Sequence, residues 1–558
     1  MKRTVLIVAG ILVSLMLFTG AAFANSTYAS QTGKACTYCH ADMADFSKLT
    51  SEGQAFKNNG YKLPAPAPGY YTENDFAASV DKILGKTLQV SAPTSTVTRQ
   101  EAYKYIATLL NLKINPSEVN KVLAKFKDSK GVNAAYKSYV AIMVKNNLVS
   151  GDKSGKDYYL NAGKVLTKTE AEALLAKAKT LMYKGAPKER TFVTSEKCKT
   201  CHPTEYSSWK EDTYHSKMIM KRDEGILKDA VLKWVYDQDG NGTNDGPTIG
   251  NVTKETFSIL DVQYVVGSYW KQRYLVKNKV TGGWQLLNKQ FNRMTGKWEN
   301  YGNANDWNMM CATCHTTGYK LTYYDPANPA TSKATWSELN VGCEACHGPG
   351  SVHVYTKSKL DIWNPAKKTK AEQTRACGYC HIRVENEKYK SPQGNYREDL
   401  PAPEVGKTFM PWDDWTKWYP EELVAPGIQP EDPFDKSYTG DLAGLFKTDV
   451  LSTTYGVYEE AKHHQQYQGF IQSNHYKKNI LSCNDCHSPH KTKKTATLID
   501  PKATCSTCHG SAFDVEKIMP GTAKTADNLY VRTHTFFAGQ TRTSGPTATG
   551  KPVYYFGE

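Results

Sequence analysis

Two cysteines three positions apart, with a histidine directly after the second, recur seven times along this chain. The thiols of such a pair can add to the two vinyl groups of one haem, and the adjacent histidine then ligates the iron from the proximal side. All 14 cysteines of the chain belong to these motifs. Numbered in chain order, motifs 1 to 7 span 36–40, 198–202, 311–315, 343–347, 377–381, 483–487 and 505–509.

Seven covalently bound haem c groups are therefore the predicted cofactors. The thiols expected to hold them are Cys36, Cys39, Cys198, Cys201, Cys311, Cys314, Cys343, Cys346, Cys377, Cys380, Cys483, Cys486, Cys505 and Cys508. The expected proximal iron ligands are His40, His202, His315, His347, His381, His487 and His509. A disulfide framework or paired zinc sites would also use an even number of cysteines, but neither explains a histidine after every second cysteine.

The histidines outside the motifs match the number of irons. Seven of the 14 histidines remain, which indicates two histidines on every iron and no coordination position open to a substrate. Met309 and Met310, directly before motif 3, are alternative axial ligands. The spacing does not say which histidine serves which iron. The distal candidates are His215, His353, His463, His464, His475, His490 and His534.

The first residues have the features of an export signal. Lys2 and Arg3 precede an apolar run at 5–18, and residues 22–24 form a small-x-small cleavage site. The run is short for a membrane span, and a retained helix is the alternative. We expect a mature protein that begins near Asn25 and is secreted to the cell surface, the cell envelope or the medium.

The composition is consistent with an interior filled by haem. Mean hydropathy is −0.57 and only 40% of the residues are hydrophobic, so large apolar haem discs would supply much of the core. The net charge is +15, and the propionates of seven haems would offset most of it. Nucleic acid is therefore not an expected partner, although basic exported chains can bind it.

Motif spacing and composition divide the chain. The predicted parts are a signal peptide at 1–24, an arm with the first haem at 25–61, a Pro-rich linker at 62–94, a helical domain at 95–185 and a six-haem domain at 194–558. Apolar residues recur with helical periodicity at 99–111, 132–147 and 168–183. Thr98 and Thr167 each precede a Glu by three positions, which predicts capping boxes at two helix starts.

The helical domain also carries a family signature. Residues 126–128 read FKD, Gly151 and Gly155 frame a G-x-x-x-G turn, and 98–101 read TRQE. In this order the segment resembles an S-layer homology domain, of which it covers about one copy and the last helix of another. The resemblance implies binding to a cell-wall polymer, whereas a plain helical spacer is the alternative.

Sequences around the later motifs carry a second resemblance. Residues 343–350 read CEACHGPG and precede His353, and residues 483–490 read CNDCHSPH. With motif 2 and its downstream aromatic residues, segment 194–558 resembles the multihaem family of nitrifier tetrahaem cytochromes, hydroxylamine oxidoreductase and extracellular filament-forming cytochromes. The resemblance implies that His353 and His490 are distal ligands. It covers about two thirds of the chain, since motif 1 and the helical domain have no counterpart there.

The fold expected for the chain is mainly α with extensive irregular structure. A multihaem cytochrome built around a chain of stacked haems would be joined to the small helical domain. Residues 262–266, 273–276 and 284–287 cluster β-forming residues, and Gly282 with Gly283 gives a turn. This pattern predicts a small antiparallel β-hairpin beside the haems.

A short acidic run matches the first nine positions of a calcium loop. Thr248 stands where the loop has its glutamate, so a solvated turn is the alternative to a Ca²⁺ site. The calcium candidates are Asp237, Asp239, Asn241, Thr243 and Asp245.

The leading interpretation is a heptahaem cytochrome that conducts electrons at the cell surface to extracellular acceptors or partner cytochromes. The arm that carries motif 1 would extend the conductor into a homopolymer. Two other interpretations stay open. An oxidoreductase of the hydroxylamine, nitrite or tetrathionate type would need one five-coordinate iron, and no Cys-x-x-Cys-Lys motif of the ammonia-forming nitrite reductases occurs. A haem-bearing structural S-layer protein would pack in a lattice without exchanging electrons.

Overall fold

The structure is a computed structural model whose chain falls into two compact units. One unit combines residues 1–188 with 355–361, and the other combines 189–354 with 362–558. Motif 1, His463 and the calcium candidates lie outside the described residues. In the described part, no helix is both long enough and apolar enough to cross a membrane. The structure describes residues 70–225, 257–267, 271–278, 282–293, 295–301, 307–325, 331–383, 404–418, 457–460, 464–490, 501–510, 514–524 and 530–537.

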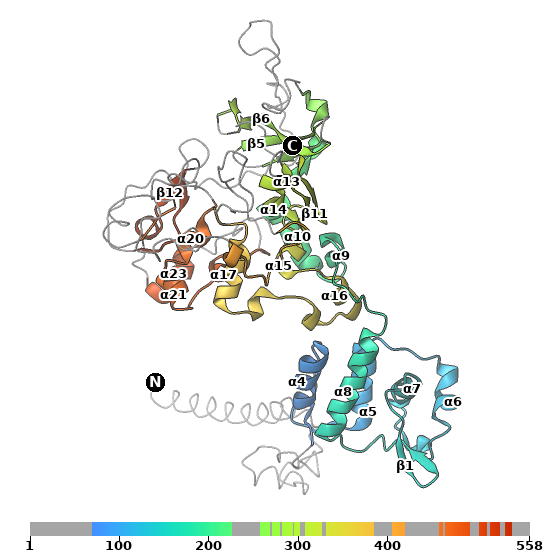
Figure 1. Ribbon diagram of the computed structural model, residues 1–558. Coiled ribbons are helices and arrows are strands. Elements are labelled where there is room, and N and C mark those ends of the chain that lie inside the picture. Colours follow the sequence, from blue (N-terminus) through green and yellow to red (C-terminus); the bar gives the residue numbers. More distant parts are fainter. Residues whose placement is uncertain are drawn as a thin grey trace, which may run out of the picture. The chain divides into compact units, whose positions relative to one another are not determined.

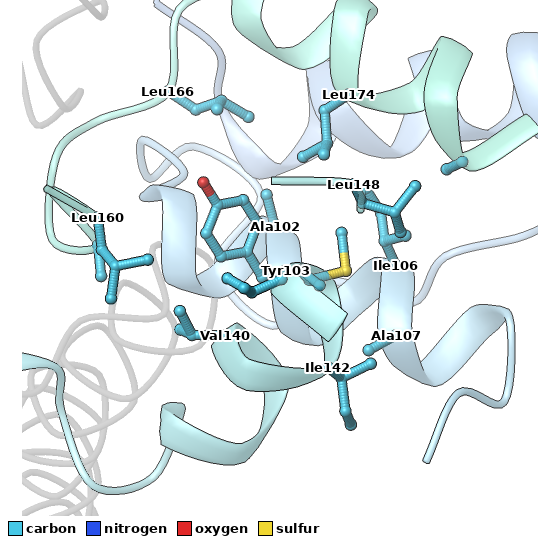
Figure 2. Close-up of a cluster of buried hydrophobic side chains, with 14 of the residues drawn as sticks. Ala102, Tyr103, Ile106, Ala107, Val140, Ile142, Leu148, Leu160, Leu166 and Leu174 are labelled. Carbon is cyan, nitrogen blue, oxygen red and sulfur yellow. The ribbon is translucent and has the colours of Figure 1, made fainter. Parts of the chain in front are cut away.

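The first unit is a helical unit with an apolar core of its own (Figure 1). Figure 2 shows Tyr103 and Ile106 of one helix meeting Val140 and Ile142 of a second and Leu174 of a third. Three of these helices lie where the periodicity predicted them. The helices are α4 (Glu73–Leu84), α5 (Arg99–Leu109), α6 (Val119–Leu123), α7 (Lys137–Lys145) and α8 (Lys168–Tyr183), and β1 (Asp152–Ser154) pairs with β2 (Asp157–Tyr159).

The two predicted capping boxes are confirmed at α5 and α8. The hydroxyl of Thr98 accepts the backbone N–H of Glu101, whose carboxylate accepts the backbone N–H of Thr98 at 2.7 Å. α4 begins with the same device and lies inside the segment 62–94 that the sequence assigned to a linker. Its buried Phe76, Val80 and Leu84 share one helical face, and α4 packs against α8.

A segment from far along the chain completes the helical unit. Residues 355–361 belong to this unit although they follow motif 4 in sequence. The buried carboxylate of Asp361 accepts hydrogen bonds from the hydroxyls of Tyr183 at 2.7 Å and Thr356 at 2.6 Å. Lys86 Nζ donates to the carbonyl of Thr356 at 2.9 Å. These hydrogen bonds attach the segment to the end of α8 and to Lys86 after α4, and they leave no pattern in the sequence.

The second unit, here called the haem unit, has short helices in or beside which the six described motifs lie. Short helices suit a chain that must follow the rims of rigid cofactors rather than bury long apolar faces. The helices of this unit are α9 (Ser195–Lys199), α10 (Pro203–Asp212), α11 (Arg222–Gly225), α13 (Trp307–Met310), α14 (Ala312–His315), α15 (Cys343–His347), α16 (Ser351–Thr356), α17 (Lys370–Gly378), α20 (Gln466–Phe470), α21 (Asn474–Lys477), α22 (Cys483–Cys486), α23 (Pro501–His509) and α24 (Val515–Ile518).

The β-structure of the haem unit is wider than the predicted hairpin. The predicted pairing is confirmed, because β5 and β6 run antiparallel from Lys277 opposite Trp284 to Lys271 opposite Asn292. Two further strands that are too short for a clear pattern extend the sheet at its edges. Its order is β3 (Ile219–Lys221), β4 (Tyr264–Val266), β5 (Lys271–Lys277), β6 (Trp284–Asn292) and β7 (Lys297–Asn300). The two-stranded sheets of this unit pair β8 (Thr316–Thr317) with β11 (Glu338–Leu339), β9 (Lys320–Tyr323) with β10 (Lys333–Thr335), and β12 (Gly521–Lys524) with β13 (Tyr530–Arg532).

The five-stranded sheet is buried on both faces. Successive side chains of a strand point to opposite faces, and Tyr274 and Leu275 of β5 enter two different apolar clusters. The cluster of Leu275 also contains Trp307 and Ala312, which flank the first cysteine of motif 3. The sheet therefore supports motif 3 from one side.

Candidate haem sites

Four proximal histidines lie ring to ring with a distal candidate from another part of the chain. An iron held between two imidazoles at about 2.0 Å from each nitrogen separates their ring centres by about 6 Å. The observed separations fit that arrangement, and the residues therefore fit a haem iron between each pair. The pairs are His202 with His353 at 6.2 Å, His347 with His490 at 6.0 Å, His487 with His534 at 6.2 Å, and His509 with His475 at 5.9 Å.

The pairs differ in the angle between their ring planes. It is 20° for His202 with His353 and 8° for His347 with His490. By contrast, the ring of His475 stands at 84° to its partner. Since the relative orientation of two axial imidazoles shapes the magnetic anisotropy of a low-spin ferric haem, the pairs are spectroscopically distinguishable.

Hydrogen bonds at the outer ring nitrogen orient several of these imidazoles. When Nδ1 carries the proton and donates it to a fixed acceptor, Nε2 is left free to ligate a metal. Three histidines have such an acceptor within reach of Nδ1. They are His347 with the Trp363 carbonyl at 2.8 Å, His534 with the Arg532 carbonyl at 3.1 Å, and His381 with the Gln466 side-chain oxygen at 3.1 Å.

Burial favours the neutral imidazole that a metal needs. It lowers the pKa of His347 and His381 below the usual value, and it lowers the pKa of His534 to about 3 and that of His215 to about 4. Electrostatic interaction with His464 also lowers the pKa of His381. Gln466, two residues after His464, is hydrogen-bonded to His381, so a fifth distal candidate is close in sequence to a residue that contacts motif 5.

Motif 3 has a different immediate environment. The ring of its His315 packs against the indole of Trp307, with centroids 5.8 Å apart and planes at 62°. The remaining described candidate, His215, is buried where it interacts electrostatically with His381 and His487.

The cysteines and hydroxyls of the six described motifs lie near those of other motifs. The Cys198 and Cys343 side chains are hydrogen-bonded, which joins motifs 2 and 4, and those of Cys377 and Cys483 join motifs 5 and 6 in the same way. Electrostatic interaction of two further thiol pairs relates motif 4 to motif 5 and motif 6 to motif 7. The described cysteines are free of disulfides, so their thiols are available for thioether bonds.

Motif 3 joins this series at motif 5. The hydroxyls of Thr313 and Tyr379, which are the third residues of the two motifs, lie 2.7 Å apart and are buried. By proximity the motifs therefore follow the order 2–4–5–6–7, with motif 3 beside motif 5. This order differs from the order along the chain, and nothing in the motif sequences would have indicated it.

Two buried carboxylates belong to the sites although the sequence analysis did not single them out. Glu460 accepts the backbone N–H of His534 at 3.0 Å and the hydroxyl of Thr533, and burial raises its pKa to about 7. Glu344 lies inside motif 4 itself. Its position between two haem-binding cysteines was a visible signal, whereas Glu460 is separated from His534 by 74 residues.

The helical unit contains a polar groove of about 190 Å³. Arg99 at its base bridges Asp152 at 2.7 Å and Glu170 at 2.6 Å. Gly151 and Lys177 also line the groove. Two of these five residues, Arg99 and Gly151, come from the stretches that carry the S-layer homology resemblance, 98–101 and the glycine turn.

Three comparisons relate the chain to known proteins. Residues 197–233 and 271–348 match the family described as "Cytochrome c554 and c-prime". Two solved structures are similar. The outer cell wall cytochrome OcwA is 20% identical over 59% of this chain and 69% of that one, with a TM-score of 0.39. The undecahaem cytochrome from the S-layer of Carboxydothermus ferrireducens is 20% identical over 88% and 74%, with a TM-score of 0.31.

No curated protein matches the chain. The segments that match the family contain motifs 2, 3 and 4 with their surroundings. The match supports c-type haem as the cofactor of this part of the chain and electron transfer as its chemistry, in a protein similar to the cytochromes c554.

Proposed function

We propose that this protein is a heptahaem cytochrome that conducts electrons at the cell surface. The observation that carries the proposal is the spacing of the four histidine pairs, which suits six-coordinate iron. Iron of this kind exchanges electrons through the haem edge and binds no substrate. The distal ligands that we assign are His353 for motif 2, His490 for motif 4, His534 for motif 6 and His475 for motif 7.

The other assignments rest on proximity and elimination. His464 is assigned to motif 5, because Gln466, two residues further along the chain, is hydrogen-bonded to His381. His215 and His463 then remain for motifs 1 and 3, with one histidine for each iron.

The contacts between motifs support a continuous conductor. Thioether bonds join the edge of each haem to its motif, so motifs in contact hold haem edges close to one another. Electrons would pass in the order 2–4–5–6–7, with a side connection from motif 5 to motif 3. Partner cytochromes or extracellular acceptors would connect at the two ends of this order.

The decisive measurement is the low-temperature EPR spectrum of the oxidised full-length protein together with its haem content. Seven haems, all low-spin, are expected. One high-spin ferric iron would overturn the purely conducting role and favour the oxidoreductase alternative. Fewer haems than motifs would overturn the heptahaem assignment.

The proposed role of the arm is assembly. Residues 25–61 carry motif 1 ahead of a Pro-rich stretch, so motif 1 would dock on a neighbouring copy and extend the conductor into a polymer. Deletion of 25–61 should leave six haems in the protein and abolish polymers in electron micrographs. Unchanged polymers would contradict this role.

Wall binding by the helical unit is the second proposed function. The groove around Arg99 offers Lys177 to an anionic polymer, while Asp152 and Glu170 hold the Arg99 guanidinium in place. Co-sedimentation with purified cell-wall polymer would test it. Lys177→Glu should weaken binding several-fold, and Lys179→Glu on the same helix, outside the groove lining, should not. An equal loss of polymer binding in both variants would show that only the net charge of the helix matters, and not the groove.

A further inference from the structure

Motif 4 contains a buried carboxylate that bonds to three separate backbone amides. Glu344 is 2% exposed. Its oxygens accept the N–H groups of Val193 at 2.9 Å, Thr194 at 2.7 Å and Gly350 at 2.7 Å. Every one of these partners is a donor, so the carboxylate acts as the acceptor in all three bonds. Burial raises the pKa of Glu344, and the three backbone bonds act against that rise.

The three amides directly precede two helices near the proposed axial histidines of motif 2, α9 ahead of His202 and α16 with His353. Thr194 is the N-cap of α9, which contains Cys198 and leads to His202. Gly350 directly precedes α16, which carries His353. One side chain of motif 4 thus holds both the proximal and the distal arm of the neighbouring iron site.

The backbone is turned to make these bonds. Thr194 has a φ of 71°, in the left-handed region that a β-branched residue seldom adopts. Such a conformation costs free energy and persists where the surroundings stabilise it. Here it accompanies the convergence of the consecutive amides of Val193 and Thr194 on one carboxylate.

A second set of bonds joins the same two motifs. The buried hydroxyl of Ser195 donates to Glu338 at 2.9 Å and accepts the backbone N–H of Cys343 at 3.0 Å. A Cβ at Gly342 would lie 2.5 Å from that hydroxyl, so the contact leaves no room for a side chain there. The start of α9 is therefore fixed to the backbone of the first cysteine of motif 4.

We propose that Glu344 is a positioning residue that sets the axial geometry at motif 2 and the coupling between motifs 2 and 4. This inference rests on the proposed assignment of haem and of His353 as a ligand. Removing one acceptor oxygen leaves buried N–H groups unsatisfied, a state that proteins avoid. Both arms of the motif 2 site would then relax together, while iron sites that Glu344 does not contact keep their geometry.

The test is Glu344→Gln in the full-length protein. The amide keeps the size of the side chain but offers one oxygen and turns two N–H donors toward the backbone amides. We expect seven haems, an altered EPR signal or a high-spin fraction for about one iron in seven, and a shifted midpoint potential for one or two haems. His353→Ala identifies which EPR signal belongs to motif 2.

Two further variants complete the experiment. Glu372→Gln removes the capping-box carboxylate at the start of α17, whose partners are exposed residues of the same turn, and it should leave every signal unchanged. Glu338→Gln weakens only the Ser195 connection and should shift the same signal as Glu344→Gln by less. If Glu344→Gln does not yield a protein with haem, Glu338→Gln supplies the EPR spectrum that tests the proposal.

The outcomes separate this role from the proposed function. A wild-type protein with missing haems or high-spin iron would contradict the heptahaem conductor itself. Wild-type spectra as expected, with Glu344→Gln indistinguishable from Glu372→Gln, would overturn the positioning role alone. Changes confined to iron sites other than those of motifs 2 and 4 would overturn it as well.

Discussion

The helical unit and the haem unit bury their interiors in different ways. The helical unit packs its own side chains, and Phe76, Ile106 and Met143 are inaccessible to solvent. In the haem unit, the described apolar clusters around the five-stranded sheet are its own, whereas thiols and imidazoles converge between short helices. The comparison teaches that the helical unit buries a continuous apolar core of its own side chains, whereas the interior of the haem unit brings together groups suited to hold the proposed haems.

Loss of one haem should therefore damage one unit and spare the other. Replacing Cys343 and Cys346 by Ser removes covalent attachment at motif 4, which lies between motifs 2 and 5 in the order of contacts. We expect the haem unit to become sensitive to protease while α4, α5 and α8 stay resistant. Limited proteolysis with haem staining and mass spectrometry of the fragments measures both. Equal sensitivity of the two units to the protease would contradict the view that only the haem unit depends on its haems.

The converse change is a cavity in the helical core. Phe76→Ala should destabilise the helical unit by about 3–5 kcal/mol, the usual cost of removing a buried phenylalanine ring. Calorimetry combined with absorbance should show a lower transition temperature for the step that leaves the Soret band unchanged. Tyr158→Ala, at a side chain 40% exposed in the same unit, is the control and should cost about 0.5 kcal/mol or less. A haem content below that of the wild type would contradict independent folding.

Removing single axial ligands sharpens the comparison within the haem unit. His353→Ala and His475→Ala should each convert one iron in about seven to a high-spin state with haem content unchanged. They should remove different low-spin EPR signals, because the two ring pairs stand at 20° and 84°. Loss of the same low-spin signal in both variants would contradict the assignment of His353 and His475 to different irons. Absence of high-spin iron in both variants would show that neither histidine is an axial ligand.

The same division explains what the sequence predicted. The capping boxes at Thr98 and Thr167 depend on residues three positions apart, and the haem motifs on five consecutive residues, so both are readable locally. The pairing of His353 with His202 joins residues 151 positions apart, and the docking of 355–361 depends on hydrogen bonds that leave no sequence pattern. The sequence did not predict β3 and β7, because each is only three or four residues long and too short to show a pattern.

The smallest expected effect is the pH dependence of the helical unit. Burial alone would raise the pKa of Glu170, but hydrogen bonds from the Thr167 amide and from Arg99 outweigh it and lower the pKa to about 2. A carboxyl whose pKa is lower in the folded state contributes stability above its unfolded pKa of about 4.5, and this contribution is lost as the pH falls toward 2. The Asp152 pKa is also lowered, chiefly by its bond to Arg99, and adds in the same direction.

Arg99→Met should remove most of this dependence, because it removes the cation shared by both carboxylates. We expect the calorimetric transition of the helical unit in the wild type to fall more steeply between pH 4.5 and pH 2 than in the variant. At pH 7 the wild type and the variant should have the same haem spectrum, since Arg99 lies in the unit that holds no described motif. Parallel curves for the two proteins would show that Glu170 and Asp152 owe their low pKa to the backbone and not to Arg99.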